Sequence, residues 1–162
     1  MPIIKEVARP ADLYDESSDE LTSLSRKRPA EVDIGGEDSA SWITLDELHD
    51  WIPRLHRLAR TPFLIVARPD DPSTFIQTYR GSAVEPHDEN PSYGLQFACG
   101  SPDRMYSAEL ADPHDVTELM WDWLENRWHR LLQVAWEKWD PPNGMVSVPS
   151  LADELRRIGF CF

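Results

Sequence analysis

Residues 63–67, Phe-Leu-Ile-Val-Ala, decide the fold because they form a short, continuous apolar run. The length and the β-branched content of this run favour a buried strand. Three further strand-like runs follow at 74–80, 93–99 and 105–110. Short polar links between the runs favour antiparallel pairing of neighbours. We therefore expect a meander of four strands at the centre of the protein.

Helix signals flank this central region on both sides. Thr44-Leu45-Asp46-Glu47 is a capping box that opens a helix, and Pro53 should kink or split that helix. Beyond the strands, Asp112-Pro113 supplies an N-cap followed by proline at the first helical position. The apolar stripe of this helix, 113–125, consists of Val116, Leu119, Met120, Trp123 and Leu124.

The C-terminal part of the sequence is less regular. Residues 128–139 fit both a helix and a strand, and we favour a helical start with a strand at about 133–139. Ser150 should cap a last short helix that ends at Gly159. The predicted fold class is α+β, an antiparallel four- to five-stranded meander sheet with helices packed on one face.

The first forty residues differ from the rest in composition. They hold ten acidic and five basic residues and contain neither Trp nor Phe. Such a segment buries too little apolar surface to offset its ordering entropy. We predict that 1–40 is an acidic, disordered N-terminal segment and that 41–162 is a single α+β domain.

Charge and hydropathy exclude several classes of partner. The net charge is −13, which repels nucleic acid and anionic membranes and attracts basic proteins. No apolar run approaches the roughly 18–20 residues of a membrane span. The N-terminus lacks the apolar stretch of a signal peptide. We expect a cytoplasmic protein whose partner is another protein with a basic surface.

Catalytic and metal-binding patterns do not stand out. The five histidines lie outside hydrolase and zinc-protease motifs, and two cysteines make no metal pattern. Seven glycines leave no loop that could cradle a phosphate. We expect a protein that is not an enzyme and that uses no metal and no cofactor.

Five of the seven tryptophans lie between residues 121 and 139. Core packing is expected for Trp123 and Trp136. Trp121 should point about 160° away from Trp123 on the same helix, and an outward tryptophan beside carboxylates is a candidate interface anchor. The predicted partner-binding residues are Trp121, Asp122, Glu125, Trp128 and Trp139.

A family resemblance covers about 60 residues of the chain. It rests on Phe-Ile-Gln-Thr-Tyr-Arg at 75–80, Tyr-x-Leu-x-Phe at 93–97 and Arg-Met-Tyr at 104–106. Gly100, Val116, Trp121, Trp123 and Trp136 belong to the same pattern. The pattern resembles small actinobacterial proteins that look like immunity proteins of polymorphic toxin systems. It is also similar to the YbjN-like secretion-chaperone fold, which implies an α+β peptide-binding module.

Three functions remain open from the sequence. The first is an immunity-type inhibitor that occludes a toxin or effector. The second is a YbjN-like peptide-binding secretion chaperone, which predicts an apolar groove between the sheet and helix 113–125. The third is a DNA-mimic inhibitor, which requires carboxylates in two rows spaced like phosphates.

Overall fold

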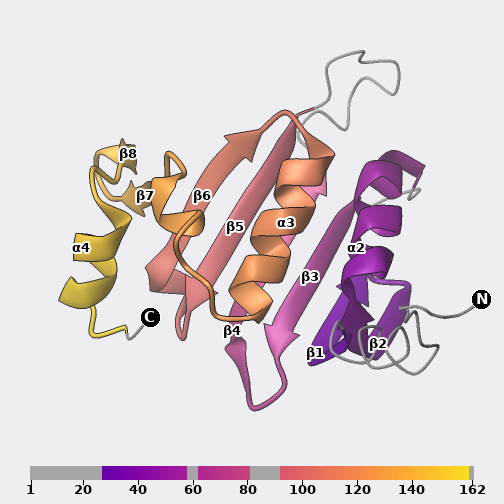
Figure 1. Ribbon diagram of the computed structural model, residues 1–162. Helices are drawn as coiled ribbons and strands as arrows, with labels where there is room; N and C mark the ends of the chain where they lie inside the picture. The colour runs from indigo at the N-terminus through magenta and orange to yellow at the C-terminus, as the bar shows by residue number, and fades with distance from the viewer. Residues whose placement is uncertain (1–26, 58–61, 81–91, 161–162) are drawn as a thin grey trace, which may run out of the picture.

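One antiparallel sheet dominates the part of the chain that the computed structural model describes, residues 27–57, 62–80 and 92–160 (Figure 1). Its eight strands follow the order β2-β1-β3-β4-β5-β6-β7-β8. They are β1 (Lys27–Ile34), β2 (Asp38–Thr44), β3 (Phe63–Arg68), β4 (Asp71–Arg80), β5 (Tyr93–Cys99), β6 (Met105–Leu110), β7 (Glu137–Asp140) and β8 (Gly144–Ser147). The predicted α+β class is confirmed, but the sheet is larger than the predicted four or five strands.

The four strands predicted from the apolar runs are β3 to β6, and they pair in chain order as an antiparallel meander. Beside them, β1 pairs with both β2 and β3. The chain must therefore cross over β1 on its way from β2 to β3, and it does so through a helical segment. This crossover is the one break in the meander among the described strands.

The predicted disorder of residues 1–40 is wrong for 27–40, because these residues form β1 and the start of β2. Within β1, Ala30, Val32 and Ile34 alternate with charged residues and are at most 6% exposed. That alternation is enough to order the strand, because β1 is paired on both sides and its apolar residues are buried on one face. Residues 1–26 lie outside the described part of the chain.

The helices lie on one face of the sheet, as predicted (Figure 1). They are α2 (Leu45–Trp51), α3 (Pro113–Leu124) and α4 (Leu151–Arg157), with the 3-10 turns η1 (Ile52–Arg57), η2 (Pro102–Arg104) and η3 (Leu131–Gln133). The capping box is present, since Thr44 and Glu47 exchange side-chain and backbone hydrogen bonds. The helix changes to 3-10 geometry just before Pro53, in agreement with the predicted split. None of the described helices is long and apolar enough to cross a membrane.

The segment 128–139 contains less regular structure than predicted. A single 3-10 turn, η3, replaces the helical start, and β7 begins only at Glu137. Trp136 accounts for the difference, because its indole Nε1 donates to the carbonyl oxygen of Leu131 at 2.7 Å. This bond turns the chain inward between the two elements and buries the indole.

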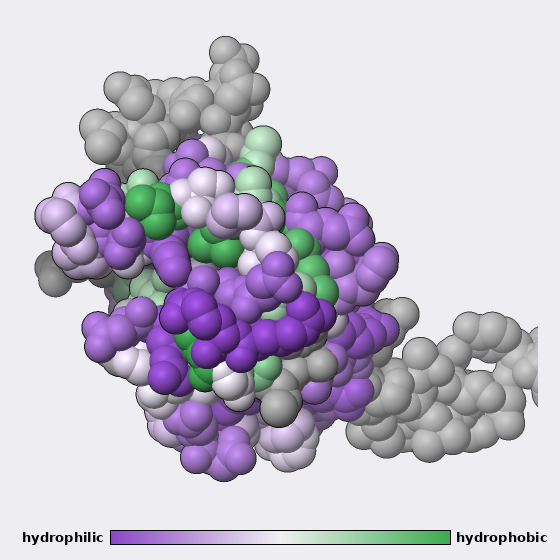
Figure 2. Space-filling model, turned by 90° about the vertical axis from the view of Figure 1, so that its left-hand side faces the viewer, coloured by the Kyte–Doolittle hydropathy of each residue, from purple (hydrophilic) through white to green (hydrophobic). Residues whose placement is uncertain are grey.

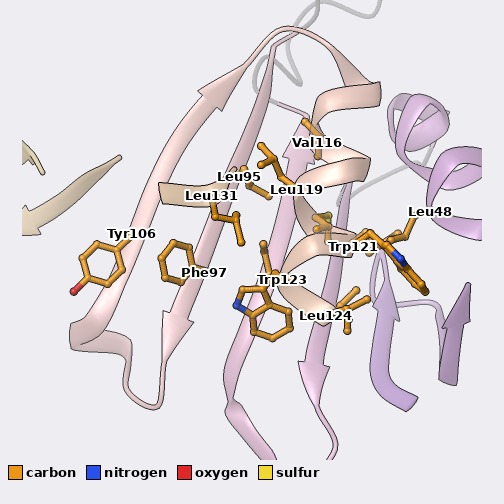
Figure 3. Close-up of a cluster of buried hydrophobic side chains, with 14 of the residues drawn as sticks. Leu48, Leu95, Phe97, Tyr106, Val116, Leu119, Trp121, Trp123, Leu124 and Leu131 are labelled. Carbon is orange, nitrogen blue, oxygen red and sulfur yellow. The ribbon is translucent and has the colours of Figure 1, made fainter. Parts of the chain in front are cut away.

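The core lies between the sheet and the helices (Figure 3). Phe97 on β5 is at its centre and contacts the rings of Tyr106, Trp128 and Trp136 at centroid distances of 4.8–5.5 Å. Trp123 of α3 is fully buried against the same sheet face. The Arg68 guanidinium lies 4.1 Å from the Trp123 ring and donates to the last carbonyl oxygens of α3, which fixes the end of this helix.

Candidate functional site

The predicted binding residues are not gathered at the surface. Trp121 is only 4% exposed, so the predicted outward indole is wrong. It does point away from Trp123, but α2 packs beside α3 and covers that flank, where Trp121 lies near Leu48 (Figure 3). Helical geometry predicted the direction of the Trp121 side chain correctly, but it could not predict that α2 packs against that side of α3.

The two predicted carboxylates are occupied by ion pairs within the chain. Asp122 is 3% exposed and accepts hydrogen bonds from Arg130 at 2.7 and 2.9 Å. Glu125 pairs with Arg28 at 2.6 Å and with Arg127 at 2.8 Å. The acidic side of α3 is therefore largely neutralised by the chain's own arginines.

The last two predicted residues have opposite environments. Trp128 is 4% exposed and packs edge-on against Phe97 and Phe160, so it belongs to the core. Trp139 is 65% exposed on β7. Of the five predicted residues, Trp139 is thus the one that presents a large apolar surface to solvent.

A different surface collects the exposed aromatic and acidic side chains. We call it the open face, the side of the sheet opposite α2, α3 and α4, and no described helix covers it. Its central row crosses the sheet in register through Asp33, Ile65, Gln77, Gln96, Ser107 and Glu137. Gln77 Nε2 donates to Gln96 Oε1 at 2.6 Å, and Gln96 Nε2 donates to Ser107 Oγ at 3.0 Å. These bonds hold the middle of the row in one arrangement.

A depression of about 540 Å³ lies at the β6 and β7 end of the open face. Its lining includes Tyr79, Gln96, Ser107, Glu109, Glu137 and Met145, and we call it the Tyr79 depression. Gly94 on β5 lies in register between Tyr79 and Glu109. A Cβ at Gly94 would meet the end of the Tyr79 ring at 2.1 Å, so the ring lies across this glycine. Because Gly94 has no side chain, the Tyr79 ring can extend over this position toward Glu109.

Exposed apolar side chains border this depression on β7 and β8. Trp139 is paired directly with Met145, and directly paired residues project from the same face. Met145 is 48% exposed and Tyr79 is 36% exposed. Figure 2 views the molecule from the β7, β8 and α4 end, where hydrophilic surface surrounds separate hydrophobic patches. Trp139 and Met145 therefore form an exposed apolar pair at this end of the sheet.

A second depression, of about 520 Å³, lies at the β1 and β2 end of the same face. Glu31, Asp33 and Ile65 line it, together with serines of β2, and we call it the Asp33 depression. Asp33 Oδ1 accepts a hydrogen bond from the Gly36 amide at 2.9 Å. This carboxylate therefore also stabilises the β1–β2 turn. None of the described residues that line the depression is aromatic.

The open face could have been found from the sequence. In 93–99 the apolar residues at odd positions face the core, so Gln96 must face away from it. A glutamine and a glycine at outward positions of a central strand are unusual if a second layer covers them. Because five tryptophans lie between residues 121 and 139, the binding site was predicted at α3 and the segment after it instead.

Among the described residues, we find no cluster of metal ligands, and the described cysteine is buried. No three His, Cys, Asp or Glu side chains in this part of the chain could hold a metal ion together. His49 and His114 stack at 5.2 Å between α2 and α3, with His49 Nε2 3.3 Å from Glu118. Cys99 is 5% exposed, and burial raises the pKa of its thiol to about 12.

This thiol should be inert in the folded protein. Because the thiolate is the reactive form, Cys99 should not react with a disulfide reagent at about pH 8 unless the protein unfolds. Thiol titration of a Cys161→Ser variant with and without denaturant measures this directly. Rapid labelling of Cys99 under native conditions would contradict the prediction.

Within its described residues the chain is thus an α+β protein in which α2, α3 and α4 lie on one face of an eight-stranded sheet and no described helix covers the other face. In comparisons with known proteins, no family model matches the chain, and neither a curated protein nor a solved structure does. Its function must therefore be inferred from the surface itself.

Proposed function

We propose that this chain is a cytoplasmic, acidic protein-binding module of the immunity type, which occludes a toxin or effector with the open face of its sheet. The observation that carries the proposal is that exposed Tyr79 and Met145 line one depression with Glu109 and Glu137, and that exposed Trp139 pairs with Met145 beside it. Aromatic residues and methionine are enriched in protein interfaces. Carboxylates around them steer a basic partner and select against acidic ones.

The charge of the whole molecule supports the same class of partner. The net charge of −13 favours fast association with a basic protein. The carboxylates near α3 are neutralised internally, whereas no described residue forms an ion pair with Glu109 or Glu137. The open face therefore has acidic groups that a partner can still engage.

The alternative functions have weaker support. A chaperone of the YbjN type would need an apolar groove between the sheet and α3, but fully buried Trp123 and Met120 fill that layer. The depression beside α3 is only about 220 Å³ and includes Asp115, Glu118 and Arg130. A DNA mimic would need two regular rows of carboxylates, and the central row of the open face is mostly uncharged.

The proposal predicts a partner whose capture depends on the open face. Replacing both Tyr79 and Trp139 by alanine should weaken binding by about 2 kcal/mol or more, roughly thirtyfold, because both would be hot-spot anchors. The measurement is co-purification of the tagged chain from its native host, followed by titration with the purified partner. Co-expression with the product of a neighbouring gene also tests whether the chain protects cells from it.

A matched pair of charge reversals separates the open face from general acidity. Glu137→Lys should abolish capture, whereas Glu37→Lys, in the β1–β2 turn, should not. Both variants change the net charge equally. Equal loss with both variants, or undiminished capture by the Tyr79 and Trp139 double variant, would refute the open face as the binding surface.

A further inference from the structure

We infer that the Tyr79 depression is a receptor for an arginine side chain of the partner, which stacks on the Tyr79 ring and pairs with Glu109 and Glu137. This inference rests on the proposed function, because it specifies the chemistry of the residue that anchors the partner. It depends on three features of the depression: an aromatic ring that lies over a glycine, two carboxylates and a polar floor.

The ring is the first feature. One side of Tyr79 lies against Gly94, at a position that the side chain of any other residue would occupy. Tyr79 also lines the depression, and the residue is 36% exposed. A guanidinium within about 6 Å of such a ring face gains cation–π energy, and its planar shape also allows stacking.

The carboxylates are the second feature. Register places Glu109 across Gly94 from Tyr79, and it places Glu137 directly beside Ser107. Both glutamates line the depression, and none of the described residues that line it is lysine or arginine. A cation supplied by the partner therefore meets two carboxylates and no competing positive charge.

The floor is the third feature. Gln96 uses its carbonyl and one amide hydrogen in the bonds to Gln77 and Ser107. The Ser107 hydroxyl accepts from Gln96 and keeps its own hydrogen to donate. The floor can therefore hydrogen-bond the backbone of the segment that carries the arginine.

The Asp33 depression provides an internal comparison on the same face. It also has two carboxylates, Glu31 and Asp33, and a similar volume of about 520 Å³. It lacks an aromatic ring, and Asp33 is engaged by the Gly36 amide. If acidity alone attracted basic side chains, the two depressions would bind them equally.

The test uses a small probe that does not depend on knowing the partner. The peptide acetyl-Gly-Gly-Arg-Gly-Gly-amide is titrated into the ¹⁵N-labelled full chain and followed by NMR. We expect saturable shifts at Tyr79, Gln96, Glu109 and Glu137. The same peptide with citrulline in place of arginine keeps the shape and loses the charge, and it should bind at least about tenfold more weakly.

Variants identify the groups that are responsible. The double variant that carries Glu109→Gln and Glu137→Gln should bind the arginine peptide about tenfold more weakly. The control variant Glu31→Gln should change binding by less than about twofold. Gly94→Ala leaves tyrosine in place but displaces its ring, so it too should weaken binding, while Tyr79→Phe should retain it. Because the two glutamates are exposed, the glutamine variants should fold normally.

Equal binding of the arginine and citrulline peptides, absence of binding, or shifts centred on Glu31 and Asp33 would overturn the inference. Capture of a native partner through Tyr79 without any peptide binding would overturn the arginine receptor and leave the proposed function intact. Peptide binding at Tyr79 without a captured partner would instead count against the proposed function while the receptor stands.

Discussion

Replacing Trp121 by alanine is expected to lower the free energy of unfolding by about 3–5 kcal/mol. The indole is 4% exposed and lies between α3 and α2, near Leu48, so its removal leaves a cavity that two helices cannot close without moving. Chemical denaturation followed by circular dichroism measures the change. Because the side chain lies far from the open face, the folded variant should still bind a partner.

Trp139→Ala provides the matched control. Trp139 is 65% exposed, so its removal should change the free energy of unfolding by less than about 0.5 kcal/mol. The two substitutions delete the same group, from a buried site on α3 and from an exposed site on β7. A Trp121 variant as stable as the parent would show that this indole faces solvent and would restore α3 as a candidate interface.

Replacing Glu154 by alanine should be the second large effect, with a loss of about 2–3 kcal/mol of folding free energy. Glu154 on α4 accepts hydrogen bonds from the Tyr106 hydroxyl at 3.0 Å, from Lys138 Nζ at 3.0 Å and from Arg157 Nη2 at 2.8 Å. The bonds from Tyr106 and Lys138 join α4 to β6 and β7. Removing the carboxylate leaves the Tyr106 hydroxyl without this acceptor and weakens the attachment of α4 to the sheet, although Leu151 and Leu155 still pack in the core.

The same carboxylate should make stability depend on pH in the acidic range. Burial alone would raise the pKa of Glu154, but the hydrogen bonds from Arg157, Lys138 and Tyr106 outweigh it and lower the pKa to about 2. The unfolded chain, with an ordinary value of 4.5, binds the proton more readily. The stabilisation is therefore complete above about pH 5 and is lost as the pH falls toward about 2.

The magnitude of this pH effect follows from the difference between the two pKa values. It corresponds to about 3 kcal/mol for a side chain that is only 10% exposed. Denaturant titrations of the parent and of Glu154→Gln between about pH 6 and pH 3 measure the larger part of it, because the loss is complete only below about pH 2. The glutamine variant should show the shallower decline, and identical slopes would assign the acid sensitivity to other carboxylates.

Local signals in the sequence determined the centre of the fold. The apolar runs gave β3 to β6, the capping box gave the start of α2, and Asp112-Pro113 with its stripe gave α3. Each signal acts within a few residues, through backbone hydrogen bonds or side-chain periodicity, so it does not depend on the rest of the chain. The same stripe placed Trp123 in the core, and the expected core position of Trp136 is also confirmed.

Tertiary structure decided the edges of the sheet and the site. The sequence of β1 is charged enough to suggest disorder, and it is ordered because β2 and β3 pair with it on both sides. Trp121 is buried because the crossover between β2 and β3 brings α2 against α3. The Tyr79 depression exists because register aligns β4, β5 and β6 so that Gly94 separates Tyr79 from Glu109. Burial and juxtaposition of this kind depend on which distant segments pack together, and periodicity within one segment carries no information about its neighbours.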